Sequence, residues 1–289
     1  MDKKIGVIAA VIVIIVAILG LFGAGVISTD GVTGSSSNAS AADNDDNTLV
    51  VGFDANFPPY GFKGDNGEYT GFDLDLAQEV CDRNNWTLSK QPIDWNSKDS
   101  ELNSGTIDCI WNGFTINGRE DQYTWTEPYI NNQQVVVVKK SANINSLADL
   151  SGKIVEAQED SSALAALEDN KTLTDTFQNL AQIAEYNTAF MDLDSGACDA
   201  IAMDIGVAQY QINSRNSDEY MIINETISSE QYGIGFKKGN TELRDTVQKT
   251  LNEMYEDGTI AKIAAKYDSY GVPGSLCMGN NTTVVNSTE

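Results

Sequence analysis

The chain has 289 residues, with 18 lysines and arginines against 42 aspartates and glutamates, and it contains no histidine. Its net charge of −24 repels phosphate backbones, so we expect no nucleic-acid partner. Without histidine it can form no Ser-His or Cys-His nucleophile pair, and catalysis would depend on carboxylates or a cofactor. The length allows one large domain or two lobes that each bury a core.

The N-terminal region begins with a predicted membrane segment. Residues 5–27 are uncharged and apolar, which is long enough to span a bilayer as a helix. Lys3 and Lys4 precede this segment and four aspartates follow it within residues 28–47, so residues 1–4 should form a cytoplasmic stub. The alternative is a removed signal peptide, although the cleavage site near Ala24 is poor. We therefore expect a chain anchored on the outer face of the cytoplasmic membrane.

Two segments lack any hydrophobic period and are predicted to be flexible. Residues 28–47 are small, polar and acidic, which is typical of a linker, and residues 277–289 are predicted to form a tail. Between them, apolar β-branched runs alternate with helical periods, which indicates an α/β protein.

The predicted elements fall into two series. The first comprises strands at 49–53, 87–92 and 108–112 and helices at 72–84 and 98–103. After an extended run at 133–140, the second comprises strands at 153–157, 182–186 and 200–203 and helices at 162–167, 189–193 and 205–212. A further extended run at 231–237 precedes helices at 242–255 and 259–267.

A short internal echo relates the two series. In both, a helix ends at Ser-Gly, and an aspartate then enters the next strand. Gly105 and Gly196 should adopt the left-handed conformation that closes a helix, with Asp108 and Asp199 following. Any α/β protein can repeat this sequence of helix end and strand start, but the repeat also agrees with two lobes of similar layout.

Several strings occur in the order and spacing of a known family. They are VGFDANFPPY at 51–60, GFDLDLA at 71–77, NGFTI at 112–116, and EPY at 127–129. Over about residues 48–272 the chain resembles the amino-acid-binding members of extracellular solute-binding protein family 3. The resemblance implies the periplasmic-binding-protein type II fold, with two α/β lobes joined by two crossover strands. Lobe I is expected at 48–137 plus 233–276, and lobe II at 138–232.

The resemblance also implies a set of ligand contacts divided between the lobes. An amino acid enclosed in a cleft needs both of its charges satisfied. Arg119, helped by Thr115, would bind the carboxylate with charge-assisted bonds. Ser161 and Ser162 lie at a helix N-terminus, where anions are favoured, and Asp204 ends a strand where it can receive the ammonium. The other expected contacts are Asp54, Phe57, Trp95, Asn112 and Gly113. Taken singly, Thr115 is more typical of a strand residue and Ser162 of a helix cap than of a ligand contact.

The side-chain pocket favours a polar or basic ligand. Phe57 and Trp95 match two aromatic positions that clasp the aliphatic part of a ligand in the family. Asp54 ends the first strand, where a donor on the ligand side chain would point. No lysine or arginine matches a second carboxylate, so glutamate and aspartate are disfavoured relative to glutamine, lysine, arginine or cystine.

The four cysteines leave their redox state open. In an extracellular protein they suggest disulfides, and Cys81 could meet Cys109 within one lobe, which would leave Cys198 with Cys277. The equal alternative is four buried free thiols.

We expect a monomeric binding protein and not an enzyme, with no cofactor or metal. Its partners would be an amino acid and the permease and ATPase subunits of an ABC importer. The alternatives are a carboxylate-using, dehydratase-like enzyme on the same scaffold and a receptor ectodomain. Four residues before the span would leave no cytoplasmic signalling domain for a receptor.

Overall fold

A computed structural model describes residues 47–215 and 217–279 of the chain. The predicted stub, membrane segment and nearly all of the predicted linker lie outside these residues. Within the described ranges, no helix combines the length and the apolar character needed to cross a membrane.

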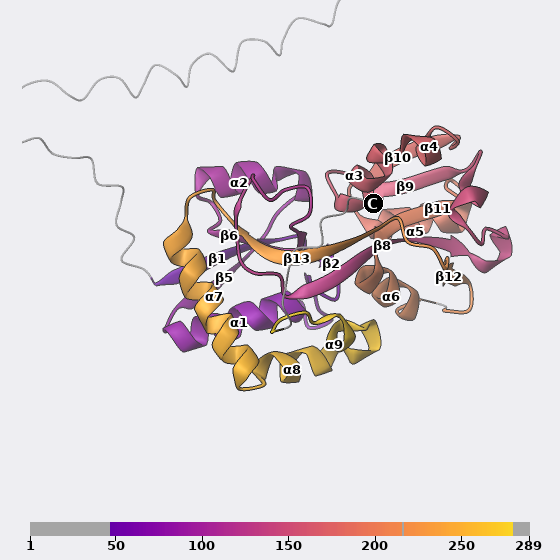
Figure 1. The fold of residues 1–289 in the computed structure, drawn as a ribbon. Helices are drawn as coiled ribbons and strands as arrows, with labels where there is room; N and C mark the ends of the chain where they lie inside the picture. The colour runs from indigo at the N-terminus through magenta and orange to yellow at the C-terminus, as the bar shows by residue number, and fades with distance from the viewer. Residues whose placement is uncertain (1–46, 216, 280–289) are drawn as a thin grey trace, which may run out of the picture. The chain divides into compact units, whose positions relative to one another are not determined.

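A mixed sheet of ten strands runs through the described chain (Figure 1), in the order β10-β9-β11-β8-β13-β6-β1-β5, with β12 on β8 and β7 on β13. Its strands are β1 Thr48–Phe53, β5 Thr87–Pro92, β6 Cys109–Thr115, β7 Thr124–Trp125, β8 Ile130–Lys139, β9 Ile154–Gln158, β10 Asn179–Ile183, β11 Ala200–Asp204, β12 Tyr220–Ile222 and β13 Ser228–Phe236. A second, small antiparallel sheet contains β2 Asn56–Phe57, β3 Gly61–Lys63 and β4 Tyr69–Thr70.

The helices fall into two groups, one in each α/β lobe (Figure 1). The first lobe carries α1 Phe72–Asn84, α2 Lys98–Ser104, α7 Thr241–Glu256, α8 Thr259–Ala264 and α9 Val272–Ser275, and the second carries α3 Ser162–Asp169, α4 Lys171–Thr174, α5 Tyr186–Ser195 and α6 Ile205–Asn213. Short 3₁₀ segments occupy Trp95–Ser97, Lys140–Ala142, Leu147–Leu150 and Ala265–Tyr270.

Two long strands, β8 and β13, connect the lobes. The first half of β8 pairs with the first half of β13 in antiparallel register. The second half of β8 then pairs with β11 of the second lobe, and the second half of β13 pairs with β6 of the first. The predicted pair of crossover strands is therefore present, and side chains at its centre lie between the lobes.

The same local device ends a helix and starts a strand in both lobes. Gly105 follows α2 with φ 81° and Gly196 follows α5 with φ 80°, the left-handed conformation that glycine adopts at little cost. The carboxylates of Asp108 and Asp199 then accept a backbone N–H from β1 at 2.7 Å and from β9 at 2.9 Å, respectively. The internal echo in the sequence is thus a structural repeat.

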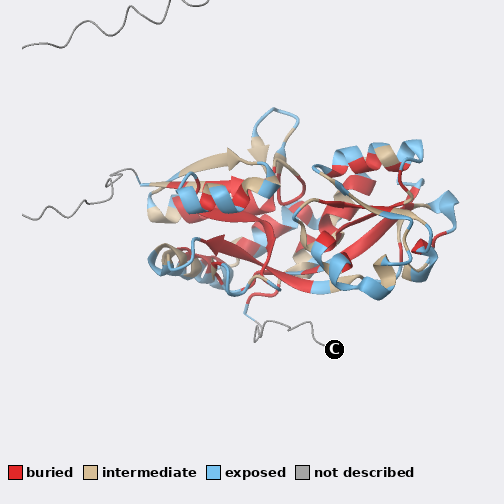
Figure 2. Ribbon diagram, turned by 90° about the horizontal axis from the view of Figure 1, so that it is seen from above, coloured by how far each residue is buried: buried red, intermediate tan, exposed pale blue. Residues whose placement is uncertain are grey.

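Burial follows the strands and the inner faces of the helices (Figure 2). Every residue of β6 is buried, which holds the strand that carries several predicted site residues rigidly in the first lobe. Cys81, Cys109, Cys198 and Cys277 are also buried, and all four are free thiols. Of the two alternatives that the sequence left open, the structure has the free thiols.

One predicted strand lies in a different place. The sequence predicts a strand at 182–186, but β10 spans Asn179–Ile183, and Tyr186 is already the first residue of α5. No side chain of β10 is fully buried, because it is the edge strand of the sheet. The alternation of apolar and polar residues that marks a strand is therefore weak there.

The packed chain also extends past residue 276, where we expected the tail to begin. Cys277 and Met278 are buried, and the backbone N–H of Cys277 donates to the carbonyl of Tyr129 at 3.1 Å. These contacts fix two residues of the predicted tail against the first lobe.

Candidate functional site

A small cavity lies between the two lobes, and nine of the ten predicted site residues line it. Its volume is about 10 Å³, which is room for about one water molecule. The lining comprises Phe57, Trp95, Asn112, Gly113, Thr115 and Arg119 from the first lobe and Gln158, Ser161, Ser162 and Asp204 from the second. The lobes meet closely here, so they must separate to admit a larger molecule.

The first lobe presents its contacts from the end of β6. Gly113 has φ 56°, and a Cβ atom at this position would lie 2.9 Å from the ring of Phe57, so only glycine fits. Its N–H donates to the buried carboxylate of Asp73. Burial raises the pKa of Asp73 to about 7, although this bond and one from Tyr129 lower it. The bond to Asp73 thus fixes the backbone of Gly113, which forms part of the cavity wall.

Arg119 follows the turn after β6, and its contacts in the described chain are with a ring and with backbone carbonyls. Its guanidinium lies over the ring of Phe114 at 5.3 Å and donates to the carbonyls of Thr115 and Asp160, both at 3.4 Å. Within the described ranges it forms no ion pair. These long bonds leave the guanidinium able to bind an anion that enters the cavity.

The second lobe contributes the start of α3. The Ser161 side chain caps this helix by accepting the N–H of Leu164 at 3.1 Å. The hydroxyl of Ser162 lies 3.0 Å from the hydroxyl of Thr115, so the two lobes touch at this point.

Asp204 ends β11 and is only 4 % exposed. Its two oxygens accept the side-chain amide of Gln134 at 3.0 and 2.7 Å. Burial raises its pKa to about 8, and the nearby charge of Glu230 adds to this effect. The site therefore holds a buried carboxylate whose negative charge is fully compensated only by a cation or a proton.

Polar residues of the crossover strands reach the site, and the sequence analysis missed them. Asn132 and Gln134 lie on β8, Glu230 lies on β13, and all three are buried. The available signal was polar residues at alternate positions in strands that also carry long apolar runs, which places them on one face.

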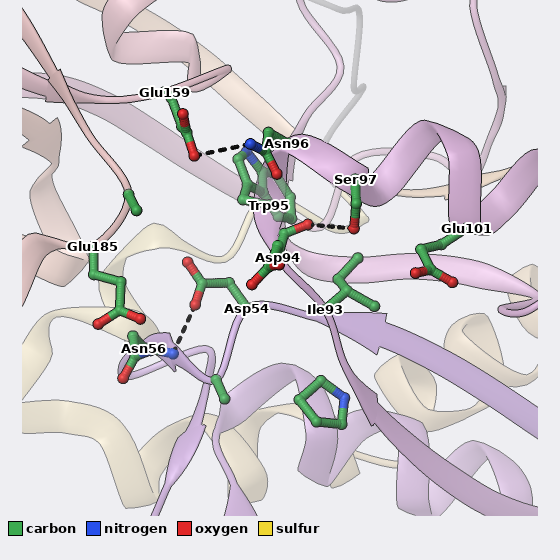
Figure 3. A pocket seen from close by; sticks show the side chains of 13 residues that line it. Asp54, Asn56, Ile93, Asp94, Trp95, Asn96, Ser97, Glu101, Glu159 and Glu185 are labelled. Carbon is green, nitrogen blue, oxygen red and sulfur yellow. Dashed lines mark hydrogen bonds between the residues drawn. The ribbon is translucent and has the colours of Figure 1, made fainter. Parts of the chain in front are cut away.

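Asp54 lies beside the small cavity, in a larger groove of about 570 Å³ (Figure 3). Trp95 lines both spaces. The Asp54 carboxylate accepts the N–H of Asn56 at 2.8 Å and the amide of Gln158 at 2.7 Å. Its pKa is raised, mainly by burial and further by the charges of nearby carboxylates. The acidic residues lining the groove are Asp54, Asp94, Glu101, Glu159 and Glu185, with no lysine or arginine among the lining residues.

Two polar contacts close the cleft beside the groove. Lys98, whose side chain is 2 % exposed, forms an ion pair with Asp160, a residue with φ 56°. The amide of Asn96 donates to Glu159 at 3.0 Å (Figure 3). Both contacts join the first lobe to the second, so they stabilise the closed arrangement.

Known proteins are similar to this chain in sequence and fold. The chain matches the bacterial extracellular solute-binding proteins, family 3, over residues 49–270. It is 29% identical over 223 residues to the L-cystine-binding protein TcyJ of Escherichia coli (strain K12), covering 76% of this chain and 82% of that protein.

Solved structures are similar as well. A substrate-binding protein of an ABC uptake transporter from Streptococcus pneumoniae, with bound histidine, is 33% identical with a TM-score of 0.74, covering 76% of this chain and 92% of that one. An ancestral arginine-binding protein bound to arginine is 37% identical with a TM-score of 0.72, covering 76% and 98%. The predicted type II fold, two α/β lobes joined by two crossover strands, is confirmed. The chain therefore belongs to the bacterial extracellular solute-binding proteins, family 3.

Proposed function

We propose that this protein captures a polar or basic amino acid between its lobes outside the cytoplasmic membrane and delivers it to an ABC importer. The observation that carries the proposal is one cavity lined by Arg119 from one lobe and Asp204 from the other. Arg119 has no ion pair in the described chain and Asp204 is buried, so the pair suits the carboxylate and ammonium of a zwitterion. Contacts from both lobes would favour a closed state when the ligand binds.

The acidic groove supports a basic side chain on the ligand. A side chain that passes Phe57 and Trp95 from the cavity reaches a space with five carboxylates and no cationic lining residue. A positive side chain would be attracted there, whereas a second carboxylate would be repelled. The histidine-bound and arginine-bound structures agree with this preference.

The remaining features of the proposal concern setting and partners. We propose that residues 5–27 anchor the chain, that the protein is a monomer without enzymatic activity, and that permease and ATPase subunits receive its ligand. We place lobe I at 48–137 plus 233–278, since Cys277 and Met278 pack against it, and lobe II at 138–232. The names of the relative and of the two solved structures describe binding proteins, and one of these structures is the substrate-binding protein of an ABC uptake transporter, which supports a binding role.

A thermal-shift screen of the chain against the twenty amino acids and L-cystine tests the function. A ligand that binds only the folded state at a hundredfold excess over Kd adds about 2.7 kcal/mol of stability, which gives a clear rise in Tm. We expect the largest rises with L-arginine, L-lysine or L-histidine. A screen in which no amino acid raises Tm would refute the proposal.

The substitution Asp54→Asn tests the side-chain preference. It removes a buried charge but preserves shape, so it should weaken binding of L-arginine more than binding of L-glutamine. Asp94→Asn is the comparison variant, and its effect on the preference should be smaller, because Asp94 lines the same groove but is exposed to solvent, which screens its charge. Equal effects of the two substitutions on the preference would contradict the role of Asp54.

A further inference from the structure

The amide nitrogen of Gln134 has more acceptors around it than it has protons. Nε2 lies 3.0 and 2.7 Å from the two oxygens of Asp204, 2.8 Å from Oε1 of Glu230 and 3.0 Å from Oγ of Ser162. A primary amide has two protons, so four acceptors exceed what it can satisfy. An ammonium group carries three protons and a full positive charge, and it matches this surrounding better.

The side-chain amide oxygens of Gln134 and its near neighbour Asn132 form no hydrogen bond in the described chain. Oε1 of Gln134 and Oδ1 of Asn132 are buried and lack a hydrogen-bond partner in the described chain. Gln134 is 0 % exposed and Asn132 is 3 % exposed. A buried polar atom without a partner is costly, so the present contacts of these amides are not the best available to the site.

Glu230 accepts hydrogen bonds from two hydroxyl groups of the cavity and, at 2.8 Å, from the side-chain amide of Asn132. Its Oε1 accepts the hydroxyl of Thr115 at 2.8 Å and that of Ser162 at 3.2 Å. A hydroxyl has one proton, so a hydroxyl that donates to Glu230 offers only lone pairs to other groups. Both hydroxyls line the cavity and lie 3.0 Å apart, so while they donate to Glu230 their lone pairs remain available to a donor in the cavity.

Charge also favours a cation at this point. Asp204 and Glu230 are 4 % and 6 % exposed, and neither forms an ion pair with a residue in the described ranges. Burial together with the charge of Glu230 raises the pKa of Asp204. Two buried carboxylates that share one amide nitrogen are stabilised when a cation replaces it.

We propose that Glu230 is a positioning residue for the α-ammonium of the ligand, and that Gln134 Nε2 occupies the position that this ammonium takes. Glu230 acts with Asp204, and while it accepts the hydroxyls of Thr115 and Ser162, their lone pairs are available to the ammonium. This inference rests on the proposed function. Because Gln134 and Glu230 lie on β8 and β13, the exchange of amide for ammonium takes place on the strands that connect the lobes.

Calorimetric titration of the full-length chain in detergent tests the proposal. The probes are L-arginine, L-lysine and L-histidine, each compared with its deamino analogue, in which hydrogen replaces the α-ammonium group. In Glu230→Gln the affinity for the amino acids should fall roughly tenfold to a hundredfold, the range for a hydrogen bond to a charged group. Affinity for the deamino analogues should change by less than about threefold, since they lack the group that Glu230 positions.

Glu156→Gln is the matched control, because Glu156 is also 6 % exposed and lies on β9 outside the cavity lining. It should leave the ratio between each amino acid and its analogue unchanged. If Glu230→Gln lowers both affinities equally, Glu230 is merely structural and the proposal is wrong.

Gln134→Ser gives a second, independent test that holds even if Glu230→Gln does not fold. This variant removes the nitrogen that occupies the ammonium position, so amino-acid affinity should be maintained or increased. A loss of more than about tenfold would show that Gln134 itself binds the ligand and would overturn the proposal. A parent chain that binds none of the three amino acids would instead refute the proposed function, and this inference with it.

Discussion

Replacing Arg119 by alanine should separate ligand binding from folding. In the structure, the guanidinium makes two hydrogen bonds of 3.4 Å to carbonyls and no ion pair with a described residue. Losing such long bonds should change the free energy of unfolding by less than about 1 kcal/mol. In the complex, the same change would leave a desolvated carboxylate without its partner. That costs roughly 2–5 kcal/mol, or about 30-fold to several thousand-fold in affinity.

The assay is calorimetric titration of parent and variant with the amino acid that raises Tm most, together with urea unfolding of both. Arg83→Ala is the matched control, because Arg83 forms ion pairs with Glu79 and Asp257 on the first lobe, outside the cavity. It removes the same charge and should leave affinity unchanged. If Arg119→Ala binds as tightly as the parent, Arg119 does not bind the ligand carboxylate and our interpretation of the site is wrong.

Three further predictions concern closure, pH and the N-terminal region. Lys98→Met removes an ion pair between the lobes, so without added amino acid the chain should have a larger radius of gyration by small-angle scattering. The closed arrangement should lose about 1 kcal/mol of stability, which should weaken ligand binding severalfold. An unchanged radius would contradict the role of this ion pair in closure. The pKa of Asp204 is about 8 in the folded chain against an ordinary value of 3.8, so the folded state retains a proton that the unfolded state loses. The free energy of unfolding should therefore fall as pH rises from about 4 to about 8, and Asp204→Asn should flatten this slope in urea titrations without amino acid; an equally steep slope in the variant would exclude Asp204 as its source. Deleting residues 1–46 should leave a monomer that binds its ligand with the affinity of the parent, because the described, packed chain begins at Asn47. Gel filtration and calorimetry check this. Aggregation of the fragment would show that the folded domain does not begin at Asn47.

Local sequence determined most of the elements. The helix predicted at 72–84 matches α1, and Gly105 and Gly196 end their helices as predicted. These features depend on the periodicity of a few turns and on the backbone freedom of glycine, both of which are properties of a short segment. The edge strand β10 was misplaced because it buries no residue fully and so leaves little pattern to detect.

The sequence also pointed to most of the cavity lining, since the family strings around Asn112 and Arg119 are short and follow one another closely. It could not decide the state of the four cysteines, because whether two thiols meet depends on the packing of separate elements.

Only the tertiary structure brought Gln134 and Glu230 together. They lie 96 residues apart, and neither segment contains a pattern that predicts contact with the other. They meet because β8 and β13 pair in antiparallel register where the chain passes between the lobes, which places their side chains beside Asp204. The pair of Lys98 and Asp160 has the same origin, since one residue belongs to each lobe. Such contacts arise from how the lobes close on one another, and that geometry is set by the whole fold and by no single segment of sequence.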